Sequence, residues 1–314
     1  MIAAVSALML AAVAAAPQGE QVTVPGPQGP LAGTLLPGEG RGPAVVIIPG
    51  SGPTDRNGNS PLGVRASTYR LLAEALAREG VTSVRIDKRG MFGSAKAVAD
   101  PNEATMQGYA EDARAWAALA AKRAGARCAW LIGHSEGGLV ALQAAQDARR
   151  LCGVVLVSAA GRPLGDVMRE QFRANPANAP ILEPALKLLD EVEAGRTVDP
   201  ATLPAPLPNL FPLRVQAYMT RVFALDPATL AASARVPVVV IQGETDLQTG
   251  AADARRIAGA RPKARLVLLP GVNHVLKDVG ADRAANLRSY GDPALPIAPS
   301  VVDAVAKAIG ASPR

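Results

Sequence analysis

The sequence of 314 residues is poor in aromatic side chains, and it contains two histidines and two cysteines. Aromatic residues make up 3% of the chain, so its core must be built mainly from Val, Leu, Ile and Ala. The formal net charge is +6, but the arginines are scattered among acidic residues. No basic run is interleaved with aromatic residues, as single-stranded nucleic-acid binding would require. We therefore expect no nucleic-acid partner.

A metal centre is not favoured either, because no cluster of His, Cys and carboxylate residues has ligand spacing. We expect no metal and no cofactor. The stretch "RIDKRG" places Asp87, Lys88 and Arg89 directly after an apolar segment. We interpret it as an ion-paired turn that supports a neighbouring site, and a metal or phosphate site is the alternative.

The apolar run at the start of the chain is shorter than the roughly 20 residues that a membrane-spanning helix needs. It reads "MIAAVSALMLAAVAAAPQGE" and ends in small residues, which is typical of a secretory signal peptide, although no Lys or Arg lies close to Met1. No cysteine follows the run, so we expect no lipoprotein anchor. We predict that residues 1–16 are removed on export to the periplasm or the medium. An uncleaved membrane anchor is the alternative.

Apolar segments alternate with helical periodicity along most of the chain, after two short strands within residues 21–40. Further strands are predicted at residues 44–48, 81–87, 128–133, 153–160, 236–243 and 263–271, and helices at 69–79, 106–123, 138–150, 249–260 and 300–310. Several strands are apolar on both faces, which indicates a mostly parallel, doubly wound sheet covered by helices on both sides. Residues 162–233 are proline-rich and predict a helical cap inserted into a core of residues 17–161 and 234–314.

The stretch "LIGHSEGGLV" places Ser135 between glycines, with an apolar strand before it and a helix after it. This context favours a nucleophile elbow, in which a strained turn exposes the serine hydroxyl above a sheet. A serine needs a base to take its proton. His134 is adjacent to Ser135, so we expect its side chain to point away and to serve packing or substrate contact. His274, in the loop "PGVNHVLK", remains as the base.

The base needs a carboxylate that orients it. Asp246 follows a strand end in "VVVIQGETD" and is the preferred candidate. Glu244 is its main competitor, and Asp253 and Asp278 fit less well. Two backbone N–H groups should bind the oxyanion, and we assign them to Glu136 and to Ser51 in the loop "PGSGPTDRNGN". Asp55, Arg56 and Asn57 are expected to hold that loop by hydrogen bonds, and substrate contact is the alternative.

Taken together, "GHSEGG", "PGSGPTDRNGN", "RIDKRGMFGS", "GETDLQ" and "LPGVNHV" resemble bacterial carboxylesterases of the α/β-hydrolase fold, related to serine aminopeptidases and acylaminoacyl-peptidase-like hydrolases. The resemblance covers the chain from about Leu31 to its end. It implies an α/β-hydrolase fold with a helical cap, a Ser135–Asp246–His274 triad, and hydrolysis of small carboxylic esters without a cofactor. The segment "ADRAANLRSYGDPALP" has no clear counterpart in that pattern.

Two other functions stay open. An aminopeptidase or acyl-peptide hydrolase would use the same machinery, and an aminopeptidase would hold the substrate amine with carboxylates of the cap. The candidates are Glu170, Glu183, Asp190, Glu191 and Glu193. A non-catalytic binding module is the third hypothesis, but such a protein would usually have lost a member of the triad.

Cys128 begins one apolar strand, and Cys152 lies just before the next. Parallel neighbours in a sheet are about 4.8 Å apart, which is within the Cα separation that a disulfide tolerates. In an exported protein the pair could stay bridged. We favour a disulfide, and two buried free thiols are the alternative.

Overall fold

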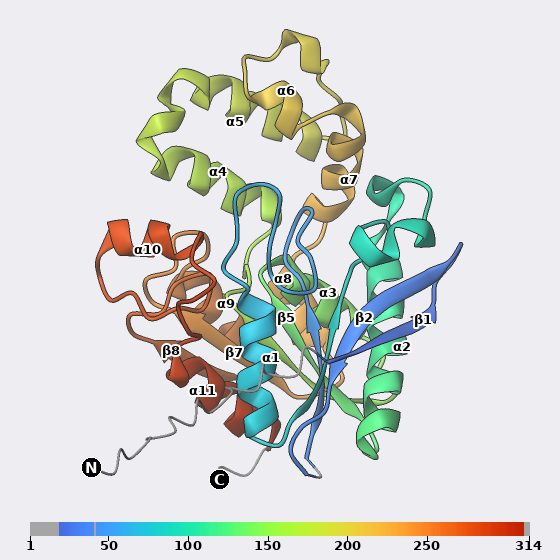
Figure 1. Cartoon of the computed structure of the whole chain (residues 1–314). Helices are drawn as coiled ribbons and strands as arrows, with labels where there is room; N and C mark the ends of the chain where they lie inside the picture. Colours follow the sequence, from blue (N-terminus) through green and yellow to red (C-terminus); the bar gives the residue numbers. More distant parts are fainter. Residues whose placement is uncertain (1–18, 41, 311–314) are drawn as a thin grey trace, which may run out of the picture.

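The computed structural model describes residues 19–40 and 42–310, so the expected signal peptide lies outside the described residues. Within these ranges eight strands form one sheet in the order β1-β2-β4-β3-β5-β6-β7-β8 (Figure 1). β1 and β2 are antiparallel to their neighbours, and the strands from β4 to β8 run parallel. The strands are β1 (Glu20–Pro25), β2 (Pro30–Leu36), β3 (Ala44–Ile48), β4 (Thr82–Ile86), β5 (Ala129–His134), β6 (Leu151–Val157), β7 (Val238–Gly243) and β8 (Arg265–Leu269).

The helices cover both faces of the sheet (Figure 1). They are α1 (Thr68–Arg78), α2 (Met106–Ala124), α3 (Glu136–Ala144), α4 (Leu164–Ala174), α5 (Leu182–Glu193), α6 (Leu207–Leu210), α7 (Leu213–Phe223), α8 (Pro227–Ser233), α9 (Ala251–Ala260), α10 (Arg283–Ser289) and α11 (Pro299–Ile309). Short 3-10 helices lie at η1 (Phe92–Ala97), η2 (Pro101–Glu103), η3 (Pro176–Ile181) and η4 (Pro200–Thr202). Throughout the described ranges, every helix is too short or too polar to cross a membrane.

One predicted helix was too long. We expected residues 138–150 to be helical, but α3 ends at Ala144. The chain then turns toward β6, which begins at Leu151, and Arg150 takes a φ of 59°. The return to the neighbouring strand therefore shortens the helix, although the local composition would allow it to continue.

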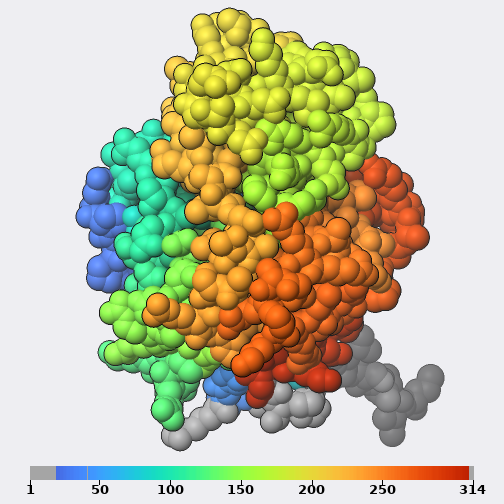
Figure 2. All heavy atoms as spheres, turned by 180° about the vertical axis from the view of Figure 1, so that it is seen from behind, coloured from blue at the N-terminus to red at the C-terminus, as the bar shows by residue number. Residues whose placement is uncertain are grey.

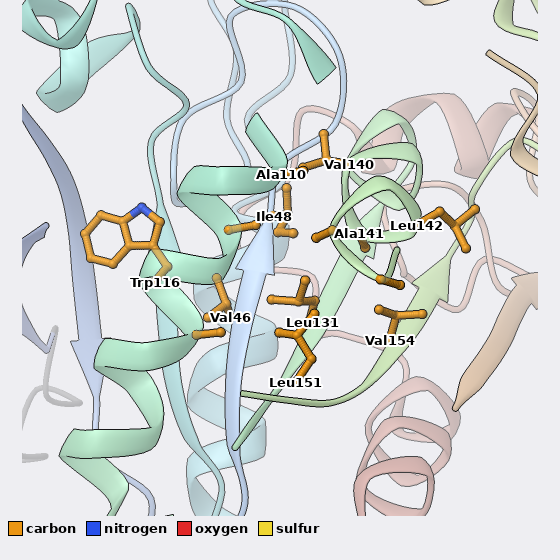
Figure 3. Packing of buried hydrophobic residues seen from close by; sticks show 14 of the residues in the cluster. Val46, Ile48, Ala110, Trp116, Leu131, Val140, Ala141, Leu142, Leu151 and Val154 are labelled. Atoms are coloured by element: carbon orange, nitrogen blue, oxygen red, sulfur yellow. The ribbon is translucent and has the colours of Figure 1, made fainter. Parts of the chain in front are cut away.

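Alternate residues of the central strands belong to two separate hydrophobic clusters, one on each face of the sheet. On one face Val46, Leu131 and Val154 pack against α2 and α3, as Figure 3 shows around Trp116 and Leu142. On the other face the intervening strand residues pack against α1 and α11. Because a strand places successive side chains on opposite faces, apolar residues at consecutive positions bury both faces of the sheet. The expected doubly wound architecture is confirmed.

The strand order reverses at β3, which lies between β4 and β5. In an open α/β sheet, ligands bind outside the carboxyl ends of the strands at such a reversal. The loop that follows β3 and the turn that follows β5 are therefore neighbours, although about 85 residues separate them in sequence.

The segment between β6 and β7 forms most of the material above the sheet. Helices α4, α5, α6 and α7 lie above the carboxyl ends of the strands (Figure 1), and they form a distinct lobe in the view from behind (Figure 2). They share a hydrophobic cluster of their own, which includes Leu188, Leu189 and Phe223. We call this lobe the cap. Helix α8 differs, because Ala231 belongs to the core cluster of α2 and α3.

Cys128 and Cys152 form the disulfide that the sequence favours, with a Cα–Cα distance of 5.3 Å. The pairing of β5 with β6 is irregular at this point. Ala129 lies opposite Leu151 and Trp130 opposite Gly153, so Cys152 is the additional residue between the two pairs. The sequence pattern alone did not predict this irregularity.

We expect the Cys128→Ala/Cys152→Ala variant to lose on the order of 3 kcal/mol of unfolding free energy, because the bridge restricts a loop of this length in the unfolded chain. Urea unfolding of both proteins measures the difference. Alkylation of two free thiols in unfolded, unreduced protein from its native compartment would contradict the bridge.

Candidate active site

Ser135 occupies a sharp turn between β5 and α3. Its backbone has φ 53° and ψ −124°, which a non-glycine residue rarely adopts. The turn requires small neighbours, because a Cβ on Gly133 would collide with the carbonyl of Gly137, and a Cβ on Gly137 with the carbonyl of Ile48. This is the strand, strained turn and helix that the sequence motif predicts.

Asp246 and His274 come together although 28 residues separate them. Asp246 follows β7 and His274 follows β8, and Asp246 Oδ2 lies 2.8 Å from His274 Nδ1. The backbone N–H groups of Gln248 and Thr249 donate to Asp246 Oδ1 at 2.7 and 3.1 Å. Burial opposes ionisation of this carboxyl, but His274 and the two N–H groups outweigh it, so the pKa of Asp246 lies below its usual value.

The competing carboxylates lie elsewhere. Asp253 is bound to Arg162, with Oδ2 2.9 Å from Nη2, and Glu244 is exposed. Asp278 is held at the turn near Gly280, whose N–H donates to Asp278 Oδ1 at 3.4 Å. Among the four carboxylates considered from the sequence, the structure places Asp246 against His274.

Segment 281–296, which the family pattern did not explain, forms hydrogen bonds with the loops that carry Asp246 and His274. Asn273 precedes His274 and donates to Asn286 Oδ1 at 3.0 Å and to Ser289 Oγ at 2.7 Å. Asn286 in turn donates to the carbonyl of Thr245, directly before Asp246, at 2.7 Å. Helix α10 therefore connects the loop of the carboxylate to the loop of the histidine. No short motif in the sequence signals this function.

The loop after β3 carries Ser51 at the reversal point of the sheet. A Cβ added to Gly50 would lie 3.1 Å from the Cβ of Ser135, so this loop passes directly beside the elbow. Within the described part of the chain, no acceptor is found for the backbone N–H groups of Ser51 and Glu136. Both residues line the same cavity as Ser135.

The residues that follow Ser51 hold the loop, as the sequence predicts. Asp55 Oδ1 accepts from the N–H groups of Asn57 and Asn59, both at 2.8 Å. The backbone N–H of Arg56 donates to Asp87 Oδ1 at 2.8 Å, and Arg56 Nε pairs with Asp87 Oδ2 at 3.0 Å.

The turn after β4 is ion-paired, as expected. Besides Asp87, Lys88 Nζ lies 3.2 Å from Glu136 Oε1, with both side chains buried. Arg89 Nε lies 2.7 Å from Asp112 Oδ2. Among residues 19–40 and 42–310, no group of three or more His, Cys, Asp and Glu could hold a metal ion.

His134 has a larger role than its position in the motif suggests. Its ring is buried between Tyr69 and His274, with ring centroids 5.4 and 4.7 Å away. His134 Nδ1 lies 2.9 Å from Tyr69 Oη, and His134 Nε2 lies 2.8 Å from the carbonyl oxygen of His274. Burial, reinforced by the neighbouring His274, lowers the pKa of His134 to about 3.

A cavity of about 830 Å³ lies between the core and the cap. Ser135, Ser51 and Glu136 line it from the core. From the cap, apolar side chains of α4 and α7 line it: Leu164, Val167, Met168, Phe172, Val215 and Met219. The volume lies toward the upper end of what small-molecule sites enclose, and apolar walls with a few polar groups are typical of them.

The five cap carboxylates considered as amine ligands do not line this cavity. Glu170 pairs with Arg162, and both Asp190 and Glu193 pair with Arg169. Glu191 pairs with Arg196, and Glu183 is exposed. Among the described residues that line the cavity, Glu136 is the single carboxylate, and Lys88 already neutralises it.

A family model described as the alpha/beta hydrolase family matches residues 45–285 of the sequence. The match covers more than half of the chain, and the sheet order and the elbow agree with it. The chain therefore belongs to the alpha/beta hydrolase family.

Individual relatives are more distant. Esterase EstD of Thermotoga maritima is 26% identical over 265 residues, which cover 82% of this chain and 60% of EstD. The chain thus spans about three-fifths of the length of that curated relative. A hydrolase from Pseudomonas aeruginosa is similar in structure, with 22% identity and a TM-score of 0.55 over 93% of this chain and 99% of that one. A thermophilic esterase from Thermogutta terrifontis has 17% identity and a TM-score of 0.53 over 92% and 97% of the two chains.

The lowered pKa of His134 predicts acid sensitivity of the fold. An unfolded histidine binds a proton below about pH 6.5, whereas folded His134 stays neutral down to about pH 3. Between these values the unfolded state binds more protons, so His134 lowers stability as the pH falls, by up to about 1.4 kcal/mol per pH unit. Urea unfolding at pH 7 and pH 5 should show a smaller loss for His134→Gln than for the wild type. An equal loss in both proteins would contradict the prediction.

Proposed function

We propose that the protein is a serine hydrolase that cleaves carboxylic esters through an acyl-enzyme. Ser135 is the nucleophile, His274 the general base, and Asp246 the carboxylate that orients the base. Two observations carry the proposal: the strained Ser135 lies in the cavity wall, and Asp246 and His274 form a hydrogen-bonded pair at the same edge of the sheet. The names of EstD and of the Thermogutta terrifontis enzyme, both esterases, support the substrate class.

In the acylation step, Ser135 Oγ attacks the ester carbonyl carbon while His274 Nε2 takes the hydroxyl proton. The negative charge that develops on the carbonyl oxygen is stabilised by the backbone N–H groups of Ser51 and Glu136. Glu136 begins α3, so the positive end of the helix dipole also points toward this oxygen. The tetrahedral intermediate then expels the alcohol, which takes the proton from His274.

In deacylation, water repeats the attack on the acyl-serine. His274 takes a proton from the water, and the hydroxide adds to the acyl carbon. The second tetrahedral intermediate releases the carboxylic acid and returns the proton to Ser135 Oγ. Throughout both steps, Asp246 holds His274 Nδ1 protonated, and its own lowered pKa keeps it ionised.

Ester cleavage is favoured over aminopeptidase activity by the charges around the cavity. A free amine requires an available carboxylate, and the described cavity walls provide Glu136 alone, which is paired with Lys88 at 3.2 Å. Recruiting Glu136 would separate a buried ion pair, which is strongly unfavourable. The apolar walls instead suit an uncharged acyl or alkoxy group.

We expect Ser135→Ala to fold normally and to lose hydrolysis of a short nitrophenyl ester by several orders of magnitude, because only binding and oxyanion stabilisation remain. Asp246→Asn should lose about 10⁴-fold in kcat, because the amide favours the wrong tautomer of the base. Steady-state kinetics measures both variants.

Failure of the wild type to hydrolyse esters or to react with a fluorophosphonate would favour the non-catalytic binding module. Faster turnover of an aminoacyl nitroanilide than of the ester would favour the peptidase.

The size of the cavity predicts a preference among esters. Each methylene buried against the apolar walls contributes about 0.8 kcal/mol, or up to about fourfold in kcat/KM. We therefore expect kcat/KM to rise from acetyl to hexanoyl nitrophenyl esters. Met219→Trp, which fills part of the cavity from α7, should lower the optimum chain length. A steady decline from acetyl onward in the wild type would contradict this use of the cavity.

We also propose that the protein acts in the periplasm or outside the cell. The Cys128–Cys152 disulfide supports this, because structural disulfides persist in oxidising compartments. The apolar start of the sequence supports it as well. N-terminal sequencing of protein isolated from its native host tests the proposal, and an intact Met1 would contradict signal cleavage.

A further inference from the structure

Three loops of the candidate site are connected by one buried chain of hydrogen bonds. The N–H of Gly50, after β3, donates to Tyr69 Oη at 3.0 Å. Tyr69 Oη lies 2.9 Å from Nδ1 of His134, at the end of β5. His134 Nε2 lies 2.8 Å from the carbonyl oxygen of His274, after β8. The Tyr69 side chain is contributed by α1, which lies outside all three loops.

The chemistry of the partners fixes the direction of every bond. A carbonyl oxygen only accepts, so the Nε2 of His134 carries the proton and donates to His274. The ring is neutral, so its Nδ1 accepts. Tyr69 Oη, which already accepts from Gly50, therefore donates its own proton to His134. Each of these side-chain donors and acceptors thus has a partner, and that makes a buried polar chain rigid.

We propose that Tyr69 and His134 are positioning residues that fix the oxyanion loop, the nucleophile and the base in their positions relative to one another. The inference rests on the function proposed above. Two of the three bonds hold a backbone group at or beside a reacting residue: the N–H of Gly50, which precedes Ser51, and the carbonyl of His274 itself. The bond between them joins the side chain of Tyr69 to that of His134, which precedes Ser135. His134 packs against the ring of His274, with ring centroids 4.7 Å apart, and its hydrogen bond is to the backbone carbonyl of that residue.

The start of helix α1 is held in place by hydrogen bonds and burial, so the position of Tyr69 is well fixed. The backbone N–H of Tyr69 donates to the carbonyl of Asn57 in the oxyanion loop at 3.1 Å. Thr68 Oγ1 donates to the carbonyl of Val275, directly after the base, at 3.3 Å. Tyr69 is 2% exposed, and Leu72 and Leu76 of the same helix are buried in the core. The start of α1 therefore contacts both the oxyanion loop and the base loop.

Tyr69→Phe tests the proposal, because it keeps the ring and removes the hydroxyl shared by Gly50 and His134. Displacement of catalytic groups by a fraction of an ångström to one ångström lowers rates strongly. We expect kcat for a nitrophenyl ester to fall about 10- to 100-fold, with KM changed by less than about twofold.

Thr82→Val is the matched control. Its hydroxyl accepts from the N–H of Gly38 at 3.1 Å, and Thr82 begins β4 at the end of the sheet opposite the site. It therefore loses a buried hydroxyl in the same way, and kcat should stay within about twofold of the wild type. If Tyr69→Phe keeps wild-type kcat, or if Thr82→Val loses as much activity at equal folded fraction, the hydroxyl has a structural role only and the proposal is wrong.

A double-mutant cycle adds a second test. His134→Gln retains a donor near the position of Nε2 but removes the acceptor for Tyr69. If the two residues act through one chain, the double variant should be no slower than the slower single variant. If the fold-loss in kcat of the double variant equals the product of the two single losses, the two residues act independently and the proposal is wrong.

The wild-type protein supplies a measurement that does not depend on any variant folding. Nitrogen-15 NMR of the two histidines should show His134 neutral and protonated at Nε2. Protonation at Nδ1 would remove the acceptor for Tyr69 and overturn the chain. An active wild type with unaffected Tyr69→Phe overturns this inference alone, whereas absence of hydrolysis overturns the proposed function as well.

Discussion

The strained backbone of Ser135 is the constraint on which the rest of the site depends. A non-glycine residue held at a φ of 53° and a ψ of −124° costs on the order of 1–3 kcal/mol, so its surroundings must enforce it. The N–H of Ser135 donates to Val157 of β6 at 3.0 Å, and the carbonyl of Ser135 accepts from Gly138 at 2.9 Å. Glycine at position 137 lets α3 approach β3. The packing of the sheet thus maintains the turn that directs the serine side chain into the cavity.

The reversal of strand order at β3 explains why distant segments meet at this turn. Every group proposed for the reaction follows the carboxyl end of a parallel strand, and these ends lie along one edge of the sheet. The sheet determines which loops are neighbours, but it does not fix how far each loop extends beyond the ends of the strands. Buried polar contacts do so: Tyr69 and His134 on one side, and Asn273 with Asn286 on the other. His274 accepts from His134 and directly follows Asn273, so its loop is held by both groups.

Sequence periodicity was sufficient to place the strands of the core and the residues of the candidate site, although it made α3 too long. Val46 and Ile48 belong to a strand that is apolar at every position, and Ser135, Asp246 and His274 each follow a strand end with recognisable turn residues. The partners that hold these residues were not predictable in the same way. Tyr69 looks like an ordinary apolar position of a helix, and Asn286 like a surface residue. Their hydrogen bonds reach partners 65 and 41 residues away in sequence, which no local pattern encodes.

The cavity lies between a core and a cap that pack mainly around separate hydrophobic clusters. The cap packs around Leu188 and Leu189, which belong to neither cluster of the sheet. Leu164 and Tyr218 contact both the cap cluster and the core. Val222 of α7 belongs to the core cluster as well, and Gln171 of α4 donates to the carbonyl of Gln248 at 2.9 Å. Because each lobe buries most of its apolar side chains within itself, the two lobes do not have to pack tightly against one another. The space between them is thus left lined with apolar side chains above Ser135, and it can hold the uncharged part of an ester without disturbing either core.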